Sequence, residues 1–321
     1  MSWVLDCHFQ RRKGLFVKKA RSVNPSVSVI TPSYNQGRFI ERTIQSVLKQ
    51  DTPDLEYMVV DGGSTDETLR ILKRYEGRIR WVSERDNGQA DAINKGIIAT
   101  RGEIIGYLNS DDIYYPGALS AVVAFFEKHP DVEVVYGDAD HIDLDGTVIE
   151  PYYTEDWDYN RFKEVCFLCQ PSVFFKRRLI NKAGLFDSNL RYCMDYEYWL
   201  RLGAITSFVR LNKKLSGSRM YEDNKTLGSR VAVHWEMNSM LKKKLGKVPD
   251  RWIYNYAHTV VDQKGYTRGT PMENLKYVLL LVGVSIASFV RWRKRLPVNA
   301  VITMSKWVGV SLRNAMGISV I

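Results

Sequence analysis

The chain has 321 residues, of which 45% are hydrophobic and 26% are charged. This composition supports a full hydrophobic core in one large domain or two smaller ones, and it excludes a disordered tail or a miniature scaffold. The net charge of +10 is concentrated in residues 241–321, which contain 14 Lys and Arg against 3 Asp and Glu. No recognised nucleic-acid-binding module accompanies this charge, so we expect no nucleic-acid partner.

Four cysteines, at positions 7, 166, 169 and 193, are too few and too irregularly spaced for a disulfide framework. They favour a reducing compartment, and Cys166 and Cys169 favour buried thiols over a zinc site, because no second pair with metal-binding spacing follows. The N-terminus lacks the apolar segment of a secretory signal. We therefore predict a cytoplasmic protein.

Short β-rich runs alternate with helical periodicity from residue 26 onward, which predicts a layered α/β domain with parallel strands. The predicted strands are residues 26–31, 56–61, 79–83, 103–109 and 132–138.

Helices are predicted between these strands. Residues 38–50 place Ile40, Ile44, Val47 and Leu48 on one face, at the spacing of a core-facing helix. Ser64 and Glu67 have the spacing of a capping box that would open a second helix. Pro116 suits the first turn of a third helix.

Polar clusters follow the first four predicted strands, at residues 31–35, 61–64, 83–88 and 109–112. Ligands of open α/β sheets bind beyond the carboxyl ends of the strands. We therefore expect the four clusters to lie along one edge of the sheet.

The adjacent carboxylates of Asp111 and Asp112 follow an almost uncharged run. One interpretation is that they cap the next helix or form an Asx-turn. The alternative is a metal site, because like charges side by side repel unless a cation meets them. Mg²⁺ or Mn²⁺ binds through one or two carboxylates together with substrate phosphates, and we favour this interpretation.

Five segments, in this order, carry a family resemblance: VSVITPSYNQGRFIERTIQSVLKQ, VVDGGSTDET, DNGQADAINKG, YLNSDD and MDYEYWLRL. With them the chain resembles a family 2 glycosyltransferase from about residue 26 to about residue 226. The resemblance implies an α/β fold of the glycosyltransferase A type, a Rossmann-like, mostly parallel sheet with flanking helices. It also implies inverting transfer from a nucleotide-sugar donor.

The predicted organisation has three parts. Residues 1–25 form an N-terminal extension, residues 26–230 a catalytic domain, and residues 231–321 a basic, partly apolar helical extension. Within the catalytic domain, residues 26–140 are the nucleotide-sugar and metal half and residues 141–230 the acceptor half.

The resemblance also implies roles for individual residues on the donor side. The donor contacts it implies are Thr31, Pro32, Tyr34, Asn35, Asp61, Gln89, Asp91, Asn94, Lys95, Asn109, Ser110, Asp111 and Arg219. Thr31, Pro32 and Tyr34 would line the base pocket, and Asp61 would accept a hydrogen bond from the base, usually uracil. Asp111 with Asp112 would hold Mg²⁺ or Mn²⁺. The chain departs from the family pattern at Asn109, which replaces the first carboxylate of the D-x-D motif, and at Ile93, Met194 and Tyr221.

Inverting transfer requires a general base for the acceptor hydroxyl. The family's E-D motif aligns with residues 194–199, which makes Asp195 the predicted base and Glu197 the second choice. The structural alternative for Asp195 is an N-cap of the following helix. Gln170 and Ser172 are predicted to lie on the acceptor side, although ordinary strand positions would explain them equally well.

The basic C-terminal part has two open interpretations. Its apolar run at residues 278–290 is shorter than the ~20 residues of a spanning helix, so we do not expect a single membrane crossing. Apolar faces flanked by Lys, Arg and Trp suit a helix in an anionic membrane interface, which would place the protein peripherally at the inner face. The alternative is packing on the catalytic domain or on a second subunit, and the sequence leaves the oligomeric state open.

The predicted function is therefore metal-dependent, inverting transfer of a sugar from a nucleotide sugar, expected to be UDP-linked. The acceptor would be a hydroxyl of a saccharide or lipid-linked saccharide in surface polysaccharide or glycoconjugate synthesis. A catalytically degenerate relative that binds a nucleotide sugar or a partner is the alternative, motivated by the four departures.

Overall fold

A computed structural model describes residues 26–225 and 227–317. The predicted N-terminal extension, the prediction about a secretory signal and Cys7 lie outside the described residues. The sheet is built from β1 (Val27–Ser33), β2 (Leu55–Asp61), β3 (Arg80–Ser83), β4 (Ile104–Tyr107), β5 (Ile113–Tyr114), β6 (Val134–Ile142), β7 (Val148–Pro151), β8 (Val173–Lys176) and β9 (Phe208–Arg219).

The strands pair in the order β3-β2-β1-β4-β8-β6-β9-β5, with β7 on β6. The pairs within β3-β2-β1-β4 are parallel, whereas β8 is antiparallel to both β4 and β6. The predicted α/β fold class with flanking helices is confirmed, and the sheet is mixed, with antiparallel pairs in its other half. The parallel half brings the carboxyl ends of four strands to one edge.

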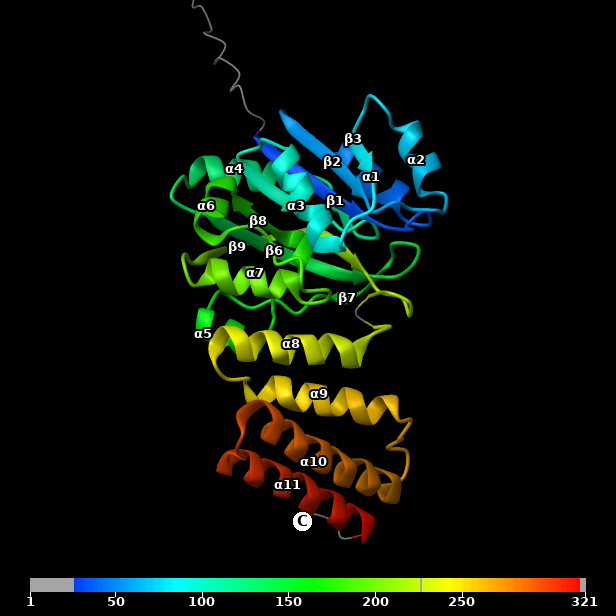
Figure 1. The fold of residues 1–321 in the computed structure, drawn as a ribbon, viewed down its shortest axis with the longest axis vertical. Coiled ribbons are helices and arrows are strands. Elements are labelled where there is room, and N and C mark those ends of the chain that lie inside the picture. Colours follow the sequence, from blue (N-terminus) through cyan, green and yellow to red (C-terminus); the bar gives the residue numbers. More distant parts are fainter. Residues whose placement is uncertain (1–25, 226, 318–321) are drawn as a thin grey trace, which may run out of the picture.

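Eleven helices accompany the sheet in the described part of the chain (Figure 1). They are α1 (Ile40–Leu48), α2 (Thr68–Arg74), α3 (Gln89–Ala99), α4 (Ala118–Lys128), α5 (Tyr159–Glu164), α6 (Ile180–Ala183), α7 (Met194–Gly203), α8 (Arg230–Leu245), α9 (Asp250–Gln263), α10 (Pro271–Arg293) and α11 (Val298–Ala315).

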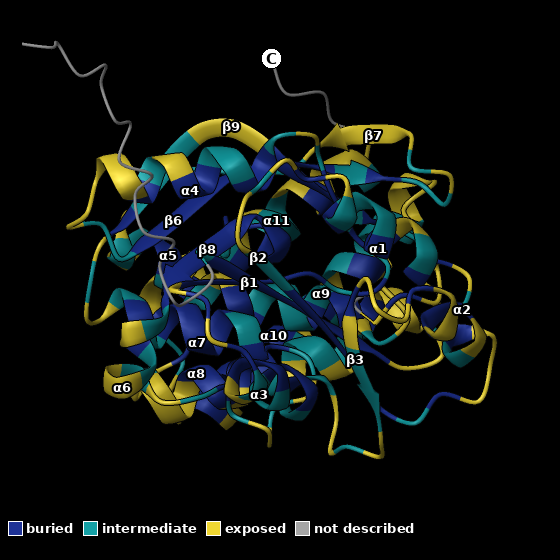
Figure 2. Cartoon of the chain, turned by 90° about the horizontal axis from the view of Figure 1, so that it is seen from above, coloured by how far each residue is buried: buried dark blue, intermediate teal, exposed yellow. Residues whose placement is uncertain are grey.

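The sheet is covered on both faces, which is why its strands read as almost continuous apolar runs. Val27 and Val29 of β1 belong to the core cluster that contains residues of α1 and α4, whereas Ile30 belongs to the cluster of α3 and α7. Figure 2 accordingly shows the central strands buried between layers of helices. Alternate residues of one strand therefore anchor helices on opposite faces.

Several predicted helix starts differ in the structure. Ser64 does not cap α2, because its hydroxyl donates to Asp61, and α2 begins at Thr68 with no side-chain cap. Helix α4 begins at Ala118, beyond Pro116. Asp195 is not an N-cap either, since α7 begins one residue earlier, at Met194.

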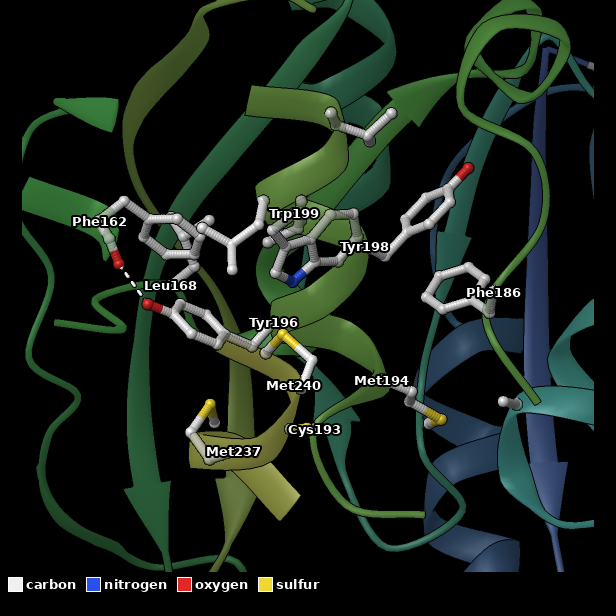
Figure 3. Packing of buried hydrophobic residues seen from close by; sticks show 14 of the residues in the cluster. Phe162, Leu168, Phe186, Cys193, Met194, Tyr196, Tyr198, Trp199, Met237 and Met240 are labelled. Atoms are coloured by element: carbon white, nitrogen blue, oxygen red, sulfur yellow. Dashed lines mark hydrogen bonds between the residues drawn. The ribbon is translucent and has the colours of Figure 1, made fainter. Parts of the chain in front are cut away.

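The C-terminal helices form a stack that continues from α7 through α8 and α9 to the hairpin of α10 and α11 (Figure 1). Helices α7 and α8 pack through apolar side chains: Figure 3 shows Met237 and Met240 of α8 near Tyr196 of α7. The Tyr196 hydroxyl also donates to the Phe162 carbonyl oxygen at 2.6 Å. The element that carries Asp195 is therefore held between the sheet and the C-terminal stack.

Candidate active site

The four polar clusters lie along one edge of the sheet, as the sequence predicts. Hydrogen bonds connect the loops that follow β1 and β2: the Asn35 N–H donates to the Ser64 hydroxyl at 2.7 Å, and the Thr65 N–H donates to the Asn35 amide oxygen at 2.9 Å. Asn35 adopts a φ of 52°, a left-handed conformation that asparagine tolerates better than most residues. Asn35 thus ties one loop to the next.

Asp61 at the end of β2 is fully buried and is surrounded by donors. Its Oδ2 accepts hydrogen bonds from the Ser83 hydroxyl at 2.6 Å and the Ser64 N–H at 2.9 Å, while Oδ1 accepts one from the Ser64 hydroxyl. These hydrogen bonds hold the loops after β2 and β3 together around the Asp61 carboxylate. Among the described residues, Oδ1 accepts only the hydrogen bond from the Ser64 hydroxyl, so the predicted hydrogen bond from a base to Asp61 stays a prediction.

The other residues predicted to bind the base divide into buried and open ones. Thr31 is buried and its hydroxyl lies 3.1 Å from that of Tyr57, and Pro32 is also buried. Tyr34 is 61% exposed, so its ring is available to stack on a planar ligand.

The carboxylates of Asp111 and Asp112 differ in environment. Asp112 is buried, and its two oxygens accept from the Arg219 N–H at 2.8 Å and the Asn109 amide nitrogen at 3.2 Å. Asp111 is half-buried; its Oδ2 accepts from the Tyr221 hydroxyl at 2.9 Å, and Oδ1 accepts from none of the described residues. Burial raises the pKa of both carboxyls, and the charge of Asp111 raises that of Asp112 further.

These carboxylates have no cationic side chain as an ion-pair partner in the part of the chain that the structure describes. The Arg219 guanidinium donates to the backbone oxygens of Asp111 and Asp143, so it is held beside the pair without bridging to either carboxylate. Buried like charges favour a bound cation. The described residues contain no group of three or more His, Cys, Asp and Glu side chains that could hold a metal alone. Asp111 nevertheless fits Mg²⁺ or Mn²⁺, which need only one or two carboxylates when phosphate oxygens complete the shell.

Asn109 is the centre of a chain of hydrogen bonds across the site. The Lys225 ammonium donates to the Gln89 side-chain oxygen at 2.7 Å, and the Gln89 amide donates to the Asn109 oxygen at 2.6 Å. The Asn109 amide nitrogen then donates to Asp112. An aspartate at position 109 has no N–H to donate, so this departure from the D-x-D pattern has a structural reason.

Three other residues predicted on the donor side bond to the protein itself. The Asp91 carboxylate accepts the Asn87 N–H at 3.0 Å. Asn94 clamps Phe186 through two hydrogen bonds, and Lys95 forms an ion pair with Glu84 at 2.8 Å. Ser110 is buried, and its carbonyl oxygen accepts a hydrogen bond from the Thr43 hydroxyl at 3.0 Å. In this structure they position loops, whereas Gln89 belongs to the chain of hydrogen bonds at the site.

The two carboxylates of α7 have separate environments. Asp195 is half-buried in the first turn, where the helix dipole favours negative charge; its Oδ1 accepts the Tyr196 N–H at 2.7 Å, and Oδ2 accepts from none of the described residues. Burial raises the pKa of Asp195. Glu197 is fully buried and paired with Arg201 at 2.8 Å and with Lys244 of α8. These pairs give Glu197 a structural role, so the geometry favours Asp195.

The residues predicted on the acceptor side also differ. Ser172 is fully buried, and its hydroxyl lies 2.6 Å from that of Ser216, inside the sheet. Gln170 donates to the Tyr107 carbonyl oxygen at 2.7 Å, but its side-chain oxygen is buried without a partner among the described residues. The Tyr107 hydroxyl is also buried and has no hydrogen-bond partner among the described residues. Such groups are rare unless a ligand or water meets them.

Two residues of the site, Tyr107 and Lys225, are missing from the sequence-based prediction. Burial raises the pKa of Tyr107, and the charges of Asp195 and Asp112 raise it further. Lys225 comes from the segment after β9 and is near Asp195. The signals in the sequence were their positions, two residues before Asn109 and six after Arg219.

Comparison with known proteins gives a consistent result. The family model described as glycosyl transferase family 2 matches residues 28–184. A chondroitin synthase of Escherichia coli is 31% identical over 225 residues, which are 68% of this chain and 32% of that protein. An uncharacterised glycosyltransferase of Rickettsia typhi is 30% identical over 221 residues, which cover 65% of this chain and 68% of the relative. The chain therefore spans about a third of the chondroitin synthase and about two thirds of the rickettsial protein.

Solved structures share the fold. Staphylococcus aureus TarS, residues 1–349, in complex with UDP-GlcNAc aligns with a TM-score of 0.58 at 16% identity and covers 91% of this chain and 92% of that one. A mannosyltransferase of Pyrobaculum calidifontis, in complex with GDP-Man and Mn²⁺, aligns with a TM-score of 0.55 at 18% identity, covering 94% and 84%. At this identity the likeness concerns the fold alone.

Proposed function

Because the chain belongs to glycosyl transferase family 2 and is a glycosyltransferase, we propose that it transfers a sugar from a nucleotide-sugar donor by a metal-dependent, inverting reaction. The donor is UDP-linked and the acceptor is a hydroxyl of a saccharide or lipid-linked saccharide. The relative named chondroitin synthase supports a role in surface polysaccharide or glycoconjugate synthesis. The scarcity of cysteines supports a cytoplasmic location.

One observation carries this proposal. Asp111, a carboxylate with a free oxygen and no ion-pair partner among the described residues, lies at the end of β4, and Asp195 presents a second free oxygen from α7. The buried Tyr107 hydroxyl lies within the electrostatic influence of both sites. An inverting transferase needs these two functions, phosphate stabilisation and a base, on either side of a sugar.

On the donor side, Asp111 would hold Mg²⁺ or Mn²⁺ while Asp112 fixes the loop through Arg219 and Asn109. When bound, the metal supplies Lewis-acid stabilisation of the diphosphate. Lys225 contributes a further positive charge, since its ammonium already reaches Gln89 from the segment after β9. Tyr34 offers its exposed ring to the base.

On the acceptor side, Asp195 takes the proton of the attacking hydroxyl. The acceptor oxygen forms a bond to the anomeric carbon as the bond from that carbon to the diphosphate oxygen breaks, so the configuration inverts. The unpartnered Tyr107 hydroxyl and Gln170 side-chain oxygen bind hydroxyls of the sugars. The proposed role of Ser172 is to hold β8 against β9, because its hydroxyl lies within hydrogen-bond distance of the Ser216 hydroxyl.

The alternative is a degenerate relative that binds a nucleotide sugar without turnover. Its support is the replacement of family carboxylates by Asn109 and Met194.

A thermal-shift panel tests donor and metal dependence. Wild type and Asp111→Asn are each heated with UDP, GDP and dTDP sugars, with and without Mn²⁺. We expect a UDP sugar with Mn²⁺ to raise the Tm of the wild type, because a ligand that binds only the folded state stabilises it. The Asp111→Asn variant should lose the part of this rise in Tm that depends on Mn²⁺. Stabilisation of the wild type by none of the donors would contradict the proposal.

A further inference from the structure

The outer side of the α10–α11 hairpin carries apolar side chains that no described residue covers. We define this apolar face by six residues that are each 38% to 53% exposed, namely Leu279, Ile286, Val290, Val301, Ile302 and Leu312. Three of these residues, Ile286, Val301 and Leu312, line an apolar groove of about 430 Å³ between the two helices, together with Val282 and Val308. Contiguous apolar surface of this kind marks a binding site. Figure 1 shows the hairpin at the end of the molecule farthest from the sheet.

The inner side of the hairpin is packed and hydrogen-bonded. The Tyr277 hydroxyl donates to Asp262 of α9 at 2.7 Å, the Asn274 amide donates to the Ser311 hydroxyl at 3.0 Å, and Trp307 packs on Tyr254 of α9. Helix α10 is long and apolar enough to cross a membrane by length and composition. Spanning would bring these polar contacts into hydrocarbon or break them. The contacts therefore favour a hairpin of which only the outer side meets a partner.

The charge of the hairpin identifies the partner's chemistry. Residues 271–317 contain seven Lys and Arg but only one acidic residue, Glu273, which is used in a capping box with Thr270. Five basic side chains on α10, on α11 and in the turn between them are exposed and form no ion pair with any described residue. We call them the basic rim: Lys276, Lys294, Arg295, Lys306 and Arg313. A second copy of the chain would bring like charges together, whereas an anionic lipid surface complements them.

We propose that the apolar face and its basic rim dock on the surface of an anionic bilayer, with α10 and α11 lying in the interface. The inference does not depend on the proposed donor chemistry, because the hairpin contributes no residue to the site. Helices α8 and α9 lie between the hairpin and α7 (Figure 1), so docking holds the site above the bilayer.

Co-sedimentation of the full chain with vesicles tests this inference. The vesicles are phosphatidylcholine alone or phosphatidylcholine mixed with an equal amount of phosphatidylglycerol. The variants are Lys294→Glu with Arg295→Glu, and Ile286→Gln with Val290→Gln; Lys73→Glu with Lys128→Glu on the catalytic domain is the charge-matched control. Circular dichroism and Mn²⁺-dependent thermal shift verify that each variant is folded and binds donor.

We expect the wild type to bind the anionic vesicles and to release them in high salt. Reversal of Lys294 and Arg295 should weaken binding about tenfold or more, and the Ile286 and Val290 variant should also bind more weakly, while the control binds like the wild type. The inference would be overturned if the wild type did not bind anionic vesicles, or if the Lys294 and Arg295 variant bound them as tightly as the wild type. A concentration-dependent dimer that disappears with Ile286→Gln and Val290→Gln would instead identify a second copy as the occupant.

Discussion

Asn109 connects the donor loops, and its amide is both a donor and an acceptor there. We expect Asn109→Asp to lower the free energy of unfolding by about 1–3 kcal/mol without metal, since a hydrogen bond to Asp112 is replaced by repulsion between carboxylates. Mn²⁺ should restore part of this loss. Urea unfolding with and without Mn²⁺ measures both effects.

Asn109→Ala is the matched variant, because it removes the hydrogen bond and adds no charge. It should be destabilised without gaining a response to Mn²⁺. If Asn109→Asp unfolded like the wild type in the absence of metal, the proposed contact between positions 109 and 112 would be wrong.

As the proposed base, Asp195 is expected to give the reaction a pH dependence. Burial raises the pKa of this carboxyl above its usual range, and only the ionised form accepts a proton. Activity should therefore rise with pH as Asp195 deprotonates, with a midpoint above the ~4 of an ordinary aspartate. The measurement is kcat/KM for the acceptor at saturating donor and Mn²⁺, so that the donor carboxylates are already occupied. A midpoint at or below the ordinary value would contradict the assignment.

For individual residues, the sequence predicted where the polar side chains lie in the fold better than it predicted their hydrogen-bond partners. The polar residues at the strand ends do line one edge, because parallel pairing places them there. The bonds of Asp61 to Ser83, of Asn94 to Phe186 and of Arg219 to Asp111 could not be read from the sequence, since each joins segments that are distant in the chain. All three side chains bond to other parts of the protein in this structure, and their predicted donor contacts stay predictions.

At the element scale, α8 orients the start of α7. The Glu236 carboxylate accepts the backbone N–H groups of Arg191, Tyr192 and Cys193, directly before the turn that carries Asp195. Glu236→Gln should reduce kcat about tenfold or more through misplacement of the base, and lower the free energy of unfolding by about 1–3 kcal/mol. The apparent affinity for UDP with Mn²⁺ should be unchanged.

Steady-state kinetics and urea unfolding measure these effects. Glu127→Gln on α4 is the control, because that glutamate is exposed and forms no side-chain hydrogen bond or ion pair with the described residues. If Glu236→Gln had the kcat of the wild type, the hydrogen bonds to Glu236 would not be needed to orient the start of α7.

Helices with a strong apolar periodicity could be predicted from the sequence, whereas the residues at which they begin were predicted less well. The stripe of Ile40, Ile44 and Val47 is the buried face of α1, as predicted. The capping box at Ser64 was wrong because the hydroxyl found a stronger acceptor in the Asp61 carboxylate. The dependence of α7 on Glu236 has no local signal, since the partners are more than forty residues apart.

At the scale of the whole molecule, the structure combines polar loops along a parallel sheet edge, the proposed base Asp195 on α7 and a supporting stack of α8 and α9. The α/β class and the family were predictable because the motifs occur in order along one half of the chain. The division into a catalytic domain and a helical extension stays a prediction. The packing of α8 on α7 shows that the two parts share a core.

Release of nucleotide from a UDP sugar tests the central claim most directly. With Mn²⁺, the wild type should release UDP in the presence of acceptor, and Asp195→Asn should release it about 10²–10⁴-fold more slowly. Asp195→Asn should retain the Mn²⁺-dependent rise in Tm with UDP, because it leaves the donor side intact. Release at the wild-type rate by Asp195→Asn, or no Mn²⁺-dependent release by the wild type with any donor, would contradict the account.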